Sequence, residues 1–213
     1  TAKELAAAKK YCVGGFLMSL EKTVERMLWL GESELFHGEI RKPEDIVKDI
    51  ENVTLEDIIS EDALNIVNST GVIDNIEVSN SASDGLDLDF SEIKINRLNI
   101  SSSGNDCADF SSGYYIVIKA ELSNCLDKGV SLGEKSSLNI MEIIISNSKI
   151  GVAVKDSSVI NIEKADIKST EMCFSAYRKK QEFGPSEINL GTYLCNASLT
   201  NFIQRGSVLN ARS

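Results

Sequence analysis

Six aspartates in the middle of the chain are the residues best suited to do chemistry. They are Asp84, Asp87, Asp89, Asp106, Asp109 and Asp127. Apolar residues alternate with Asp87, Asp89 and Asp109, so a strand would turn these three carboxylates to its outer face. Carboxylates gathered on one face bind hard cations such as calcium, or serve as acid and nucleophile in glycoside cleavage.

A spacing of 22 residues relates Asp87 to Asp109 and also Asp84 to Asp106. If each 22-residue repeat forms one coil, these carboxylates stack about 5 Å apart, which is the spacing of neighbouring strands. Like charges at that distance repel each other. Water and salt, a raised pKa of one carboxyl group, or a bound cation would relieve this repulsion. We find no lysine or arginine in line with these carboxylates.

Three interpretations of this acidic face follow. The first is a solvated edge of a structural or ligand-binding scaffold with no catalytic residue. The second is a calcium site at Asp87, Asp89 and Asp109, in a chain that otherwise needs no cofactor. The third is a carbohydrate-active enzyme, a polysaccharide lyase or hydrolase, that uses the same three carboxylates. The candidate cation-binding or ligand-binding residues are Asp84, Asp87, Asp89, Asp106 and Asp109.

A repeat of about 22 residues, from Ile73 to Lys180, positions these side chains. One apolar column holds Val78, Ile100, Leu122, Ile145 and Ile167, a second holds Leu86, Ala108, Val130, Val152 and Phe174, and a third holds Ile93, Tyr115, Leu138 and Ile160. Period-two alternation around each column predicts three short strands per repeat. The sequence therefore predicts a mainly β fold, a parallel β-helix of about six coils over residues 61–213. The rule for parallel crossovers makes it right-handed.

Polar and small residues occupy the expected turns of this β-helix. One turn column holds Asn80, Ser102, Asn124, Asn147 and Ser169, and a corner column holds Gly85, Cys107, Gly129, Gly151 and Cys173. Asn and Ser side chains can hydrogen-bond along stacked turns, and glycine gives a corner backbone freedom. The step between Leu122 and Ile145 is one residue longer, a change that a turn absorbs.

Residues 1–60 carry a different pattern. Apolar residues three or four apart predict helices over 2–20, 22–36 and 44–53, and Thr54 caps a short fourth helix over 55–59. An open β-helix end exposes unpaired strand edges. We therefore expect the helical segment to cover the N-terminal coil that contains Leu64, Ile66 and Ile73.

Charge and composition exclude several classes of partner. A formal net charge of −10 disfavours nucleic acid, whose phosphates need clustered Lys and Arg. No apolar run is long enough to span a membrane. Five cysteines without CxxC spacing are expected to act as small buried hydrophobes, with a paired or reactive thiol as the alternative. Tyr114 and Tyr177 are the aromatic pair expected at the surface. A glycan or another protein remains as partner, and the oligomeric state is left open.

Several segments of the repeat carry a resemblance to a known family. They are SASDGLDLDFSEIKI, GNDCADFSSG, DKGVSLGEKSSLNI, IGVAVKDSSVINI and FSAYRKKQEFGPSEI. Residues 61–213 resemble the right-handed parallel β-helix attached to bacterial CotH-type kinase proteins and related surface proteins. The resemblance implies a non-kinase accessory domain at the cell surface or outside the cell.

The N-terminal run resembles a second family. KELAAAKKYCVGGFLMSLEKTVERMLWLGESELFHGEIRKPEDIVKDIENVTLEDI is similar to the closing helical segment of pitrilysin or insulinase-type zinc metallopeptidases. The zinc-binding H-x-x-E-H helix of that family has no counterpart, because the single histidine, His37, cannot supply two imidazoles. The resemblance implies an accessory fragment that takes its metal site from a partner chain. Two families in one chain indicate a natural fusion or a chimera.

These observations predict a non-catalytic structural or ligand-binding β-helix module of a surface or extracellular protein. The carbohydrate-active enzyme and the peptidase fragment are the alternatives.

Overall fold

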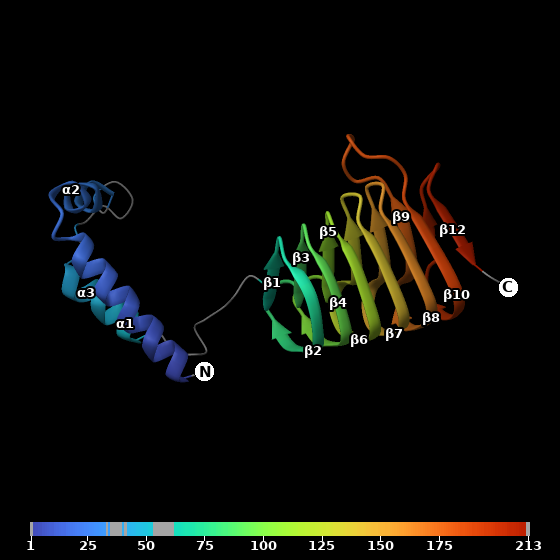
Figure 1. The fold of residues 1–213 in the computed structure, drawn as a ribbon, viewed down its shortest axis with the longest axis horizontal. Helices are drawn as coiled ribbons and strands as arrows, with labels where there is room; N and C mark the ends of the chain where they lie inside the picture. Colours follow the sequence, from blue (N-terminus) through green and yellow to red (C-terminus); the bar gives the residue numbers. More distant parts are fainter. Residues whose placement is uncertain (1, 33, 35–39, 41, 53–61, 212–213) are drawn as a thin grey trace. The chain divides into compact units, whose positions relative to one another are not determined.

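The structure is a computed structural model that describes residues 2–32, 34, 40, 42–52 and 62–211. The chain divides into two compact units, residues 1–59 and residues 60–213, and each is described by itself (Figure 1). The fourth helix expected over 55–59 and His37 lie outside the described residues.

The N-terminal unit contains three α-helices. They are α1 (Ala2–Ser19), α2 (Thr23–Glu32) and α3 (Pro43–Asn52), so the three longer helices expected from the sequence are present, and positions 33, 35 and 36 of the second expected helix lie outside the described residues. The rings of Phe16 and Trp29 meet edge to face at 6.1 Å between centroids. The Lys9 ammonium donates a hydrogen bond to the Glu51 carbonyl at 2.8 Å, which ties α1 to α3. No helix of the described residues has the length and apolar character to cross a membrane.

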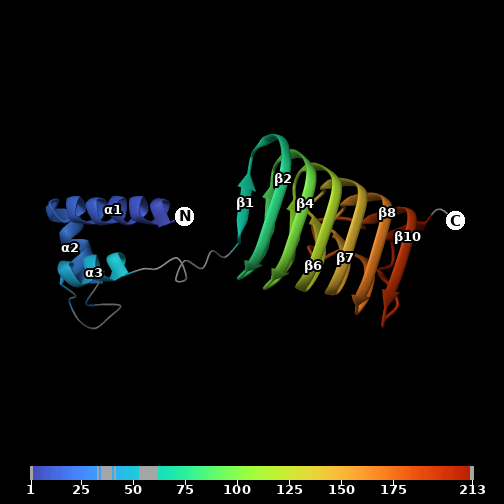
Figure 2. The ribbon, with the colours of Figure 1, turned by 90° about the horizontal axis from the view of Figure 1, so that it is seen from below.

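The C-terminal unit is the predicted parallel β-helix (Figures 1 and 2). Its strands are β1 (Leu64–Val67), β2 (Thr70–Ser81), β3 (Leu86–Asp89), β4 (Glu92–Ser103), β5 (Ala108–Ser111), β6 (Tyr114–Gly133), β7 (Ser137–Lys155), β8 (Val159–Thr170), β9 (Met172–Tyr177), β10 (Glu187–Ala197), β11 (Phe202–Ile203) and β12 (Val208–Ala211). Every strand pairing is parallel, and the third ladder runs through seven coils, from β2 to β12. The sequence predicted about six coils. The β-helix ends with the short strands β11 and β12, in which the alternation of apolar and polar residues is too brief to detect in the sequence.

The three predicted apolar columns are the three ladders of the structure. Val78 pairs with Ile100, and Leu86 pairs with Ala108. The column residues from Leu86 onward are buried, so successive coils share one continuous core. Tyr115 lies inside that core, and the single proton of its hydroxyl is shared between the carbonyl oxygens of Ser111 at 2.8 Å and Leu88 at 3.0 Å.

The predicted turn residues adopt the left-handed conformation. Positive φ angles occur at Asn80, Ser102, Asn124, Asn147 and Ser169. The Asn147 side chain donates to the Asn124 side chain in the coil before it at 3.1 Å, which is the expected stacking of turns. At the corner, a Cβ on Gly85 would lie 2.5 Å from the Ile100 side chain, so only glycine fits against the core there.

The longer repeat between Leu122 and Ile145 is absorbed in turns, as predicted. Tyr114 pairs with Ser137, 23 residues on, whereas Val130 pairs with Val152, 22 residues on. The extra residue lies in the turn after β6, where both Glu134 and Lys135 have positive φ. The register shift between Cys125 and Lys128 then restores the alignment.

Four of the five cysteines form disulfides, which corrects the expectation that most are free buried thiols. Cys107 is bonded to Cys125 and Cys173 to Cys195, and Cys12 is a free, exposed thiol. Cys107 and Cys125 are buried, so they do occupy apolar positions, but stacked coils bring their Cα atoms to 5.3 Å, within bonding range.

A long loop, residues 178–186, follows β9 and folds back on earlier coils. The buried carboxylate of Asp156 accepts hydrogen bonds from the backbone N–H groups of Lys179 and Lys180 at 2.7 and 2.8 Å. The Lys180 ammonium also pairs with Glu134, two coils back. The loop is therefore anchored to the turns beside it.

Candidate binding face

The predicted aspartates fall into two groups in the structure. Asp87 and Asp89 lie on β3 and Asp109 on β5, each half-buried on the outer face of the sheet. Asp87 and Asp109 each stand between two buried apolar residues, whereas Asp89 stands between buried Leu88 and exposed Phe90. Asp84 and Asp106 lie instead in the turns that lead into these strands. The 22-residue spacing suggested one group of aspartates, whereas the structure places them in two different environments.

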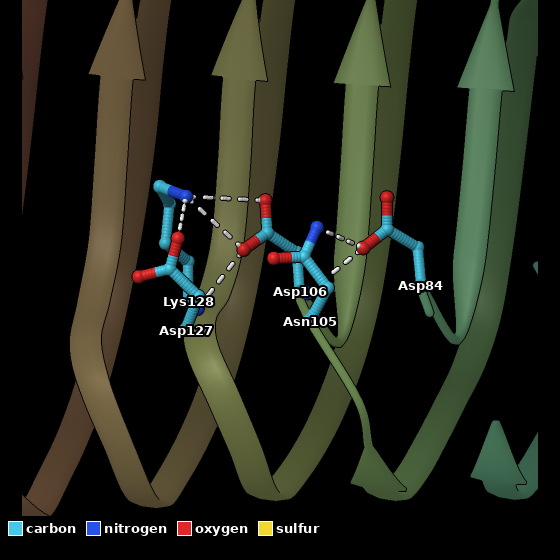
Figure 3. Close-up of polar contacts among 5 residues, drawn as sticks. All are labelled: Asp84, Asn105, Asp106, Asp127 and Lys128. Atoms are coloured by element: carbon cyan, nitrogen blue, oxygen red, sulfur yellow. Dashed lines mark hydrogen bonds and ion pairs between the residues drawn. The ribbon is translucent and has the colours of Figure 1, made fainter. Parts of the chain in front are cut away.

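The turn group forms a ladder between coils. The Asp62 carboxylate accepts from the backbone N–H of Asp84 at 3.3 Å, Asp84 accepts from Asp106 at 2.8 Å, and Asp106 accepts from Lys128 at 3.0 Å. Figure 3 shows Asp84, Asp106 and Lys128 following one another across neighbouring coils. Asn105 donates a further bond to Asp84 at 2.8 Å. Each carboxylate thus joins its coil to the next one.

Lys128 ends this ladder and supplies its positive charge. Its ammonium lies 3.2 Å from Asp106 Oδ1 and also pairs with Asp127 (Figure 3). Lys128 lies 22 residues after Asp106, so the sequence-based statement that no lysine stands in line with these carboxylates was wrong. Burial of the ammonium would lower the pKa of Lys128, but its hydrogen bond with Asp127 and the charges of both aspartates raise it.

Asp106 is almost fully buried, with 3% of its surface exposed. Burial raises the pKa of its carboxyl, and the charge of Lys128 opposes that rise without cancelling it. Burial also raises the pKa of Asp84 to about 6, against its hydrogen bond from the Asp106 backbone. These two carboxylates therefore carry a desolvation cost that Lys128 and backbone donors offset in part.

The strand group forms a row on the outer face. Asn65, Asp87, Asp109 and Ser131 are successive partners in parallel register. Asn65 donates to Asp87 at 2.9 Å, so the first carboxylate has a neutral donor. Asp109 Oδ1 and the Ser131 hydroxyl are buried without a hydrogen-bond partner. Buried polar atoms are nearly always paired, so this end of the row has unused hydrogen-bonding capacity.

Burial raises the pKa of Asp87 to about 7, and the charges of Asp89 and Asp109 add to the rise. The pKa of Asp89 is also raised, first by burial and then by Asp109 and Glu134. Repulsion between the carboxylates thus adds to the effect of burial in raising the pKa of Asp87 and Asp89, and a raised pKa is one of the three outcomes expected from the sequence.

The described residues contain no group of three or more His, Cys, Asp or Glu side chains placed to hold a metal ion. The calcium site expected at Asp87, Asp89 and Asp109 would therefore need backbone, hydroxyl or solvent oxygens to complete its ligands.

The raised carboxyl pKa values predict that the β-helix is more stable in mild acid than at neutral pH. Asp84 and Asp87 change from an ordinary value of 3.8 to about 6 and about 7, so the folded state holds more protons than the unfolded state between those values. Stability then falls as pH rises from about 4 to about 7. Thermal unfolding should give a higher midpoint at pH 5 than at pH 8, and Asp87→Asn should reduce the difference. An equal difference in Asp87→Asn would contradict this assignment.

Sequence reasoning missed Lys128, Asn65 and Ser131. Each is a residue of a different type from its column partner, although each lies 22 residues from an aspartate. Listing every residue that lies 22 positions before or after an aspartate, whatever its type, would have identified these three residues. Both Tyr114 and Tyr177 were expected at the surface. Tyr114 is 48% exposed, whereas Tyr177 is half-buried and packs against Phe202.

Comparison with known families matches the description "Right handed beta helix region" over residues 44–184, most of the chain. The chain belongs to this right-handed β-helix family. A search of curated proteins and a search of solved structures each found no match. The comparisons give no support to the CotH-type or the insulinase-type resemblance, so in this β-helix protein both remain sequence-based expectations.

Proposed function

We propose that this protein is a non-catalytic ligand-binding β-helix module of an oxidising compartment such as the cell exterior. The two disulfides support the compartment, because such bonds persist where thiols are not kept reduced. The ligand-binding surface is the acidic face, defined as Asp87, Asp89 and Asp109.

The observation that carries this proposal is the in-register stack of Asp87 on Asp109, two half-buried carboxylates on the outer face of the sheet. A ligand rich in hydroxyl groups, such as a glycan, brings hydrogen-bond donors for these carboxylates. Calcium is the alternative occupant, since a cation would also relieve the repulsion between the carboxylates.

A second function, carbohydrate cleavage, is favoured by one observation. Asp87, with its pKa near 7, is partly protonated at neutral pH beside a second carboxyl, which is the arrangement of a general acid and its partner. Release of new reducing ends or of unsaturated products from polysaccharides would reveal this activity. Asp87→Asn and Asp109→Asn should each abolish it.

The binding function is tested by titrating the full chain with a panel of oligosaccharides, and by thermal unfolding with calcium and with chelator. A ligand selective for the folded state raises the unfolding midpoint by mass action. The Asp87→Asn/Asp109→Asn double variant should lose that response. Glu163→Gln, an exposed carboxylate of β8, is the matched control and should keep it. A response that survives in the double variant would place binding elsewhere.

A further inference from the structure

Phe90 occupies a backbone position that its side chain type does not suit. In five successive coils the residue directly after the second-column strand has positive φ, with values of 51–59° at Asn68, Phe90, Ser112, Glu134 and Asp156. The other four are polar residues, of which Asn and Asp suit this conformation best, whereas a bulky aromatic side chain there is an outlier. Phe90 also exposes 61% of its surface, so it gains little from burial. Its presence is unfavourable for folding, and strain of this kind persists where it serves function.

The ring of Phe90 lies on a surface groove of about 370 Å³, next to the loop that follows β9. Glu92, Ser112, Tyr114, Glu134 and Lys135 also line this groove. Glu92 and Tyr114 are direct partners on β4 and β6, which holds the second ring next to a carboxylate. Tyr114 is 48% exposed, and its hydroxyl accepts a hydrogen bond from Asn139 at 3.1 Å. The groove thus presents two exposed aromatic rings on rigid strands and turns.

Glu92 and Glu134 both line the groove beside these rings. Glu92 is exposed, whereas Glu134 is paired with the Lys180 ammonium. The Lys135 ammonium lies 5.7 Å from the centre of the Phe183 ring, away from Phe90. In the part of the chain that the structure describes, neither Phe90 nor Tyr114 has a cation over its ring. Exposed ring faces beside carboxylates attract an organic cation, because the face of an aromatic ring carries partial negative charge.

We propose that this groove binds an alkylated ammonium group, held against the rings of Phe90 and Tyr114 with Glu92 as its counter-charge. A quaternary ammonium suits the groove better than a metal ion, since it is bulky, weakly hydrated and makes apolar contact with rings as well as electrostatic contact. The group can belong to a free ion such as choline or to the head group of a phosphatidylcholine lipid. The site is separate from the acidic face and does not depend on the function proposed for it.

The test is a titration of the full chain with choline chloride, followed by the aromatic proton signals in NMR. Its neutral analogue 3,3-dimethylbutanol has the same shape without the charge, and should bind at least tenfold more weakly. Phe90→Asn should weaken choline binding at least tenfold and yet raise the thermal unfolding midpoint, because asparagine suits the left-handed conformation. A Phe90→Asn variant that unfolds at a higher temperature and yet binds choline more weakly has lost the ring and not its fold.

Two controls complete the experiment. Tyr11→Ser removes another exposed aromatic side chain and should leave choline binding unchanged, as should Glu163→Gln, which removes an exposed carboxylate of β8. Vesicles of phosphatidylcholine, compared with vesicles of phosphatidylglycerol, distinguish the sources: retention on the former alone assigns a lipid head group, and binding of choline alone assigns a free ion. The proposal is overturned if choline binds no better than 3,3-dimethylbutanol, or if Phe90→Asn binds choline as the unmodified chain does.

Discussion

Replacing Lys128 with methionine should lower the free energy of unfolding of the β-helix by about 3–5 kcal/mol, the usual cost of removing one partner of a buried ion pair. Asp106 exposes 4% of its side chain and Lys128 exposes 13%, so water cannot take the place of the ammonium. The substitution leaves the buried Asp106 carboxylate without its cation and Asp127 without its partner. Denaturant unfolding at pH 8 would measure the loss.

Three comparisons make this prediction specific. Lys119→Met removes an exposed ion pair with Glu121 and should leave the free energy of unfolding nearly unchanged, because solvent screens that pair. Adding Asp106→Asn to Lys128→Met should recover part of the loss. The uncompensated carboxylate charge is then gone, while the side-chain oxygen at position 106 can still accept from the backbone N–H of residue 128. The loss should also be smaller at pH 5 than at pH 8, because burial raises the pKa of Asp106 and the substitution removes the Lys128 charge that opposes this rise. A loss below about 1 kcal/mol at both pH values would show that the pair is already well hydrated.

Removing the Cys107–Cys125 disulfide should cost about 3 kcal/mol, because the bond closes a loop of 18 residues and restricts the unfolded chain. Cys107→Ala with Cys125→Ser keeps both side chains small, and serine already occupies the Cys125 column at Ser103 and Ser148. Equilibrium unfolding of this variant would show the loss without a reducing agent.

The exposed thiol offers the control for the disulfide. Cys12→Ser should leave stability unchanged, since Cys12 has no disulfide partner. Reduction of the unmodified chain should destabilise it more than the double variant does, because the Cys173–Cys195 bond, which closes 22 residues, is lost as well. A fully reduced chain as stable as the oxidised one would contradict the structural role of both bonds.

The acidic face was only partly predictable. Alternation with Leu86 and Leu88 correctly placed Asp87 and Asp89 on the outer side of a strand. The same reasoning grouped Asp84 and Asp106 with them, although these two bond the backbone of the next coil. Distinguishing the two groups requires knowing where each strand begins, and a repeat fixes the distance between equivalent residues without fixing that point.

The sequence by itself determined the parallel β-helix, its three ladders and the positions of its turns. In a solenoid each coil packs only on its neighbours, so contacts fall at one constant separation and leave a visible period. The tertiary structure alone decided the Cys107–Cys125 pairing, the burial of Asp106 against Lys128 and the exposure of Phe90. These depend on side-chain direction at the corners, where the alternation of the strands ends and no period specifies which groups face each other.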